Sequence, residues 1–137
     1  MEAIAFLALL PLLGALALVT FGLWKLFLGL RWMFAPYGIA AEQSITLGDV
    51  VALNTARGDL GGAFVAAGVL CAIGLRTGQG IWLQAVAVIV GSVAVGRVVG
   101  MVSDGFATSS LVPFAVEVVM VAVLLAAARL PAPGTAS

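Results

Sequence analysis

The sequence predicts an all-α fold, a transmembrane antiparallel four-helix bundle formed by one domain of residues 1–137. Of the 137 residues, 64% are hydrophobic and 9% are charged, whereas a soluble domain is about 25% charged. The apolar residues form four continuous runs, which suit membrane helices; a β-barrel would need alternating polar and apolar positions. The links between the runs are short, and short links favour an up-down-up-down arrangement.

The first apolar run predicts a helix over residues 3–34, in which Lys25 is the one charge before the closing residues. Arg31 and Trp32 end the run, because basic and aromatic residues together are typical of a membrane interface. Residues 38–46 are predicted to form a polar link. The pattern Thr46-Leu-Gly-Asp49 then predicts an N-terminal cap for the second helix.

The other predicted helices cover residues 48–75, 81–102 and 106–129, separated by turns at residues 76–80 and at Asp104-Gly105. The uncharged stretches 60–75 and 81–96 each have 16 residues. At 1.5 Å per residue each stretch is about 24 Å long, which is less than the roughly 30 Å of a hydrocarbon core. We therefore expect Arg57, Asp59 and Arg97 to enter the edge of the membrane.

Most of the charges fall toward the end of the bundle that carries the first and third links, whereas Glu117 lies near the middle of the fourth helix. A charge at the centre of a membrane helix costs about 2.5 to 3.5 kcal/mol on insertion scales, so such groups are expected to face one another or water. Arg97 and Glu117 are separated by about 8 Å along the bundle axis, and their side chains lean toward each other. The sequence predicts an ion pair between these two residues.

A polar pocket is therefore the candidate site. Its predicted lining residues are Asn54, Arg57, Arg97, Asp104 and Glu117, with Lys25 and Asp59 as additional residues. Of the two neighbouring charges on the second helix, Arg57 is expected to face inward and Asp59 outward. The pocket would bind a small or amphiphilic ligand, by the general rule that ionisable residues within a membrane mark functional sites.

Two other readings of the same charges stay open. The charges could hold the bundle together in a structural or assembly subunit that packs with other membrane subunits or with copies of itself. A proton-relay protein or membrane enzyme is the third reading, in which the pKa of Glu117 would change when its partner leaves. Small residues at Gly58-x-x-x-Gly62 and Gly96-x-x-x-Gly100 further predict contact between the second and third helices.

Composition also excludes several classes of partner and site. With six basic and six acidic residues the formal net charge is zero, so nucleic acid is not an expected partner, whereas membrane lipid is. The chain has no His and one Cys, Cys71, so we expect no zinc, copper or haem site, no cofactor and no Ser–His triad. No catalytic residue is predicted. Basic residues divide evenly between the two ends and leave the orientation in the membrane open.

The pattern Asn54-x-x-Arg57-Gly58-x-x-Gly61-Gly62, followed by Gly96-Arg97, Asp104-Gly105 and Glu117, resembles a family of small bacterial four-helix membrane proteins. That family is known as a domain of unknown function, and the likeness extends from about residue 21 to residue 129. It implies a multi-pass protein of the bacterial inner membrane and no particular activity. A weaker likeness, in size and Gly-rich helices, is to the DoxX-like membrane proteins, which have been linked to oxidoreductase partners. Lys25 has no counterpart in either pattern.

Overall fold

The computed structural model describes residues 2–130, and their side chains from residue 9 onward; residues 131–137 of the predicted domain lie outside it. The described residues are mostly helical and contain no strand. In order, its elements are α1 (Glu2–Phe34), α2 (Pro36–Glu42), α3 (Val50–Thr55), the π-helix η1 (Ala56–Gly61), α4 (Gly62–Thr77), α5 (Gly80–Ser103), the 3-10 helix η2 (Thr108–Ser110) and α6 (Leu111–Ala127).

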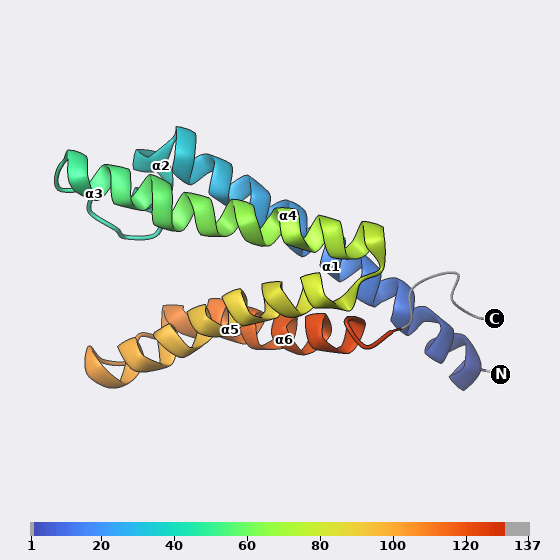
Figure 1. Ribbon diagram of the computed structural model, residues 1–137. Coiled ribbons are helices and arrows are strands. Elements are labelled where there is room, and N and C mark those ends of the chain that lie inside the picture. Colours follow the sequence, from blue (N-terminus) through green and yellow to red (C-terminus); the bar gives the residue numbers. More distant parts are fainter. Residues whose placement is uncertain (1, 131–137) are drawn as a thin grey trace.

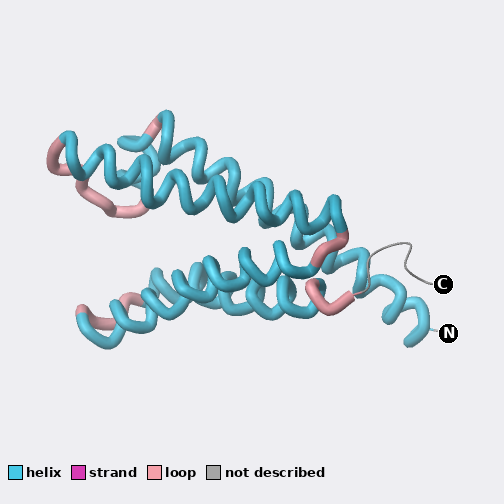
Figure 2. The backbone as a smooth tube through the Cα atoms, viewed as in Figure 1, coloured by secondary structure: helices cyan, strands magenta, loops and turns pink. Residues whose placement is uncertain are grey.

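Four segments are long and apolar enough to cross a membrane: Leu9–Phe34, Val50–Thr77, Gly80–Ser103 and Thr108–Ala127. They agree closely with the four predicted helices, so the predicted fold class is confirmed. Figure 1 shows two layers, one of α1 with α4 and one of α5 with α6. The layers meet near the α4–α5 turn and diverge toward the end that carries α3 and η2. Loops are confined to the ends of the helices (Figure 2).

Glycines bring α1 and α4 into close contact. A Cβ atom added to Gly68 would lie 2.8 Å from the carbonyl oxygen of Gly22, and one added to Gly29 would lie 2.6 Å from the backbone nitrogen of Val65. Both distances are shorter than van der Waals contact, so only glycine fits at these two positions. Such small residues let the backbones of two membrane helices approach each other.

The two predicted Gly-x-x-x-Gly motifs have a different environment. A Cβ atom at Gly58, Gly62 or Gly96 would meet no atom within 4 Å, and one at Gly100 would meet only the Asp104 side chain. Helices α4 and α5 do contact each other, as predicted. The prediction that these motifs make the contact is wrong, because an apolar helix sequence does not specify which side faces a neighbour.

A short helix, α2, occupies part of the link that was predicted to be polar. Helix α2 begins at Pro36, a residue favoured in the first helical turn, and buries Ile39 and Ala40 against Trp32 of α1. The N-terminal cap of α3 is Asp49, whose side chain accepts a hydrogen bond from the Ala52 backbone nitrogen at 2.8 Å.

Candidate functional site

The inward face of α1 carries one charged residue within an apolar stripe. Leu18, Phe21, Lys25 and Trp32 are all buried, and their spacing places them on one side of the helix. Lys25 is only 8% exposed. Charged side chains are almost never this buried unless they have a partner, so Lys25 marks a candidate site.

Two aromatic rings flank the Lys25 ammonium. Its Nζ atom lies 5.2 Å from the ring centre of Phe21 and 4.7 Å from that of Phe64 on α4. Cation–π contacts of this kind are worth about 2 kcal/mol when water is excluded. Glu117 on α6 is near enough to attract the ammonium and Arg97 on α5 is near enough to repel it. Among the described residues, Lys25 forms no ion pair and no side-chain hydrogen bond.

Arg97 and Glu117 form the predicted ion pair. Arg97 Nε donates to Glu117 Oε1 at 3.0 Å and to Oε2 at 2.9 Å. The Glu117 side chain is 7% exposed and that of Arg97 is 35% exposed, so the carboxylate is the buried partner. Neither Nη atom of Arg97 bonds to any residue that the structure describes. The guanidinium therefore satisfies both carboxylate oxygens with one nitrogen and keeps four N–H donors unused.

Lys25, Arg97 and Glu117 together define the charge cluster, with one residue each from α1, α5 and α6. It contains two cations and one carboxylate, and the surplus is one positive charge. The cations come from different layers of the fold (Figure 1), since Lys25 belongs to the α1–α4 layer and Arg97 to the α5–α6 layer. An anion placed between these cations would balance the cluster and use the free donors of Arg97.

The other predicted site residues lie apart from this cluster. Asn54, Asp59 and Asp104 are exposed, and in the described chain their side chains have no hydrogen-bonding partner. Arg57 is half-buried, and its Nη1 atom donates to the backbone carbonyl of Met33 at 2.6 Å. Arg57 thus turns toward α1, and Asp59 is the more exposed of the two, but the structure does not bring Arg57 to Arg97 or Glu117.

A second ion pair joins α1 to α2 at the polar end. Arg31 donates from Nη1 and Nη2 to the two Glu42 carboxylate oxygens at 2.8 and 2.6 Å. The Arg31 guanidinium, chiefly through its hydrogen bonds, holds the pKa of Glu42 below its ordinary value. The sequence analysis missed Glu42, because the pairing depends on α2 folding back along α1.

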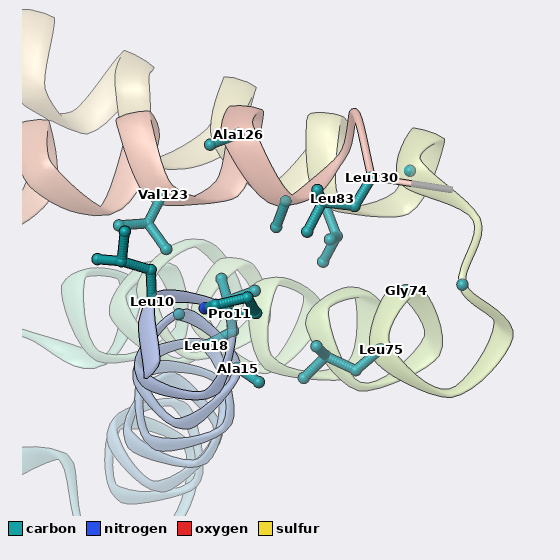
Figure 3. Close-up of a pocket in the computed structure, with 14 residues that line it drawn as sticks. Leu10, Pro11, Ala15, Leu18, Gly74, Leu75, Leu83, Val123, Ala126 and Leu130 are labelled. Atoms are coloured by element: carbon teal, nitrogen blue, oxygen red, sulfur yellow. The ribbon is translucent and has the colours of Figure 1, made fainter. Parts of the chain in front are cut away.

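An apolar cavity (Figure 3) lies beside the α4–α5 turn, at the opposite end of the fold from α2 and α3 (Figure 1). It has a volume of about 590 Å³ and is lined by α1, the α4–α5 turn and the end of α6. Pro11, Leu18, Leu83 and Val123 are among its lining residues, and none of the lining side chains is charged. Core residues such as Met120 follow Glu117 along α6 before the cavity begins. The cavity and the charge cluster are thus separate features.

Sequence reasoning identified Arg97 and Glu117 by their depth, and depth alone marked Lys25. No group of three potential metal-ligating His, Cys, Asp or Glu side chains occurs among residues 2–130. Comparison with known proteins adds no relative: no protein-family model matches the chain, and no curated protein or solved structure is significantly similar to it. The two family resemblances inferred from motifs stay predictions.

Proposed function

We propose that this multi-pass membrane protein binds an anionic small molecule or amphiphile at Lys25, Arg97 and Glu117. The observation that supports the proposal is the surplus positive charge of the cluster, with a buried ammonium that has no carboxylate of its own. Charges inside membrane proteins pair with one another or mark binding sites and ion pathways. A bound anion would pair with Lys25 and leave the Arg97–Glu117 ion pair intact.

The position of Arg97 favours a ligand that is at least partly lipid-like. Arg97 lies six residues before the end of α5, which is about 9 Å of helix. Its guanidinium is also the most exposed group of the cluster. A molecule held in the adjacent leaflet could therefore reach the free Nη donors with its headgroup, and guanidinium groups suit the two oxygens of a phosphate or carboxylate.

Extraction of the purified protein tests this proposal. The full chain is purified in mild detergent, and its bound small molecules are extracted and measured by mass spectrometry. We expect an anionic molecule in a fixed ratio to the protein, and we expect Lys25→Met to lose it because methionine has a similar unbranched side chain without the charge. Arg76→Gln is the matched control, since Arg76 is exposed at the other end of the fold. Retention of the molecule by the folded Lys25→Met variant would contradict the proposal.

A structural or assembly subunit is the second candidate function. It is supported by Gly58, Gly62 and Gly96, because a side chain at any of them would meet no atom within 4 Å. Glycine faces of this kind accept a second helix in membrane proteins. If the protein is such a subunit, a partner chain or a second copy should co-purify with it in a fixed ratio. The Gly62→Leu variant should no longer bind that chain. A monomeric, partner-free protein in mild detergent would count against it.

A further inference from the structure

The charge cluster also indicates how much charge its ligand carries, an inference that rests on the function proposed above. Arg97 contributes one cation, and its Nε atom donates two hydrogen bonds to the Glu117 carboxylate. Lys25 adds a second cation, flanked by the electron-rich faces of Phe21 and Phe64. The three groups together have a charge of plus one.

The net charge of the cluster affects binding because the cluster is buried. Glu117 and Lys25 are each less than one-tenth exposed, so water screens them weakly, and an uncompensated charge in such surroundings is strongly unfavourable. An anion with one negative charge brings the site to neutrality. An anion with two negative charges leaves the site as far from neutrality as it was before binding, with the sign reversed.

The N–H donors of Arg97 also restrict the shape of the ligand. The Arg97 Nε atom is occupied by Glu117, and the two Nη atoms have no described partner. Paired N–H donors of a guanidinium match two oxygens on one phosphorus or carbon atom. A halide presents a single point of contact and would leave donors unused, so an oxyanion fits the cluster better.

We propose that the cluster selects a singly charged oxyanion, with a phosphodiester or carboxylate group, over a doubly charged one. Lys25 and Arg97 would hold the anion from opposite layers of the fold. Glu117 has a different role: it positions Arg97 through Nε and sets the total charge of the site. The same oxyanion could belong to a lipid headgroup or to a free small molecule.

The test compares ligands that differ in charge. Short-chain phosphatidylglycerol carries a phosphodiester with one negative charge. Short-chain phosphatidic acid carries a phosphomonoester, which can take a second negative charge at alkaline pH, so the two lipids are compared at a pH where its phosphorus resonance shows the doubly charged form. Binding of each to the delipidated full-length protein is measured by calorimetry in detergent, with zwitterionic phosphatidylcholine as the baseline. We expect phosphatidylglycerol to bind at least about tenfold more tightly than phosphatidic acid. Dimethyl phosphate, a free phosphodiester, distinguishes the two sources of the oxyanion. If it binds as tightly as phosphatidylglycerol, the ligand is a soluble anion; if only the lipid binds, the ligand is a lipid headgroup.

Two charge variants sharpen the outcome. Glu117→Gln raises the charge of the cluster to plus two and should reverse the preference toward phosphatidic acid. Lys25→Met lowers it to zero and should weaken phosphatidylglycerol binding at least about tenfold, and Arg76→Gln should change neither ligand. Equal binding of the two lipids by the wild type, or an unchanged preference in a folded Glu117→Gln, overturns the inference about charge and leaves the proposed function standing. Failure of every anion to bind above the phosphatidylcholine baseline overturns both.

Discussion

Replacement of Gly68 by Ala tests the packing that places Lys25 inside the fold. The added Cβ atom would lie 2.8 Å from the Gly22 carbonyl oxygen and 2.9 Å from the Leu26 backbone nitrogen. Both atoms belong to the backbone of α1 and cannot move by rotation of a side chain. The helices must separate by roughly half an ångström to reach ordinary contact, and overpacking of this kind typically costs about 1 to 3 kcal/mol.

Gly62→Ala is the matched control on the same helix. An added Cβ atom at Gly62 meets no atom within 4 Å, and its backbone is helical, with φ −61° and ψ −47°. Both substitutions gain up to about 1 kcal/mol in intrinsic helix propensity, so this gain cancels in the comparison. We expect Gly68→Ala to be less stable than Gly62→Ala by about 2 kcal/mol.

The assay is reversible unfolding by sodium dodecyl sulfate in mixed micelles, followed by far-ultraviolet circular dichroism. Gly29→Ala provides a second measurement from the α1 side, where the added atom would lie 2.6 Å from the Val65 nitrogen. Because separation of the helices relieves both clashes, the double variant should lose less stability than the sum of the two single variants. Equal stability of Gly68→Ala and Gly62→Ala would refute the close packing of α1 against α4.

Three further expectations concern other side chains. Arg97→Met should lower the free energy of unfolding by about 3 kcal/mol, because it removes the guanidinium that donates both hydrogen bonds to the buried Glu117 carboxylate. The same unfolding assay should show recovery when Glu117→Leu is added, and a neutral single variant would contradict the burial of this pair. Because the folded-state pKa of Glu42 is lowered, its ion pair stabilises the fold above the unfolded pKa of about 4.3 and loses that contribution as pH falls through the lower folded value. A carboxyl titration by nuclear magnetic resonance should show that Arg31→Gln returns the Glu42 pKa toward its ordinary value, and an unchanged value would show that the pair does not form. Cys71 is fully buried and its Sγ lies 3.4 Å from the Leu18 carbonyl oxygen, so it should react with a maleimide only after unfolding, and fast labelling of the folded protein would contradict this burial.

The lengths of the apolar runs and the depths of the charged residues could be predicted from the sequence, because both depend only on position along the helix axis. Four uninterrupted apolar stretches are sufficient to predict four membrane helices, and the structure has them within a few residues. The Arg97–Glu117 ion pair followed from the same one-dimensional reasoning. The chain has few charged residues. A cation and a carboxylate at similar depth in neighbouring antiparallel helices therefore have few other side chains with which to pair.

Rotation about the helix axis could not be predicted. These helices are apolar around their whole circumference, so no polar face shows which side turns inward. That uncertainty explains why the Gly-x-x-x-Gly motifs were assigned to the wrong surface and why the role of Gly68 was missed. It also explains why Arg57 was grouped with Arg97, whereas its guanidinium bonds to Met33 on α1.

Helix α2 and the π-helix η1 were missed for local reasons. Seven residues are too few to show a clear helical period, and α2 is stabilised by the burial of Ile39 and Ala40 against Trp32. A π-turn inserts one extra residue into a helix that otherwise has a continuous sequence pattern.

A structure of the protein determined in lipid nanodiscs that contain phosphatidylglycerol tests the central claim most directly. We expect density for an oxyanion near the Arg97 Nη atoms and the Lys25 Nζ atom, at hydrogen-bond distances of about 3 Å. The Arg97 Nε atom should remain on Glu117. A map in which Lys25 pairs with Glu117 and Arg97 extends into lipid or water, with no anion beside either cation, would contradict the account.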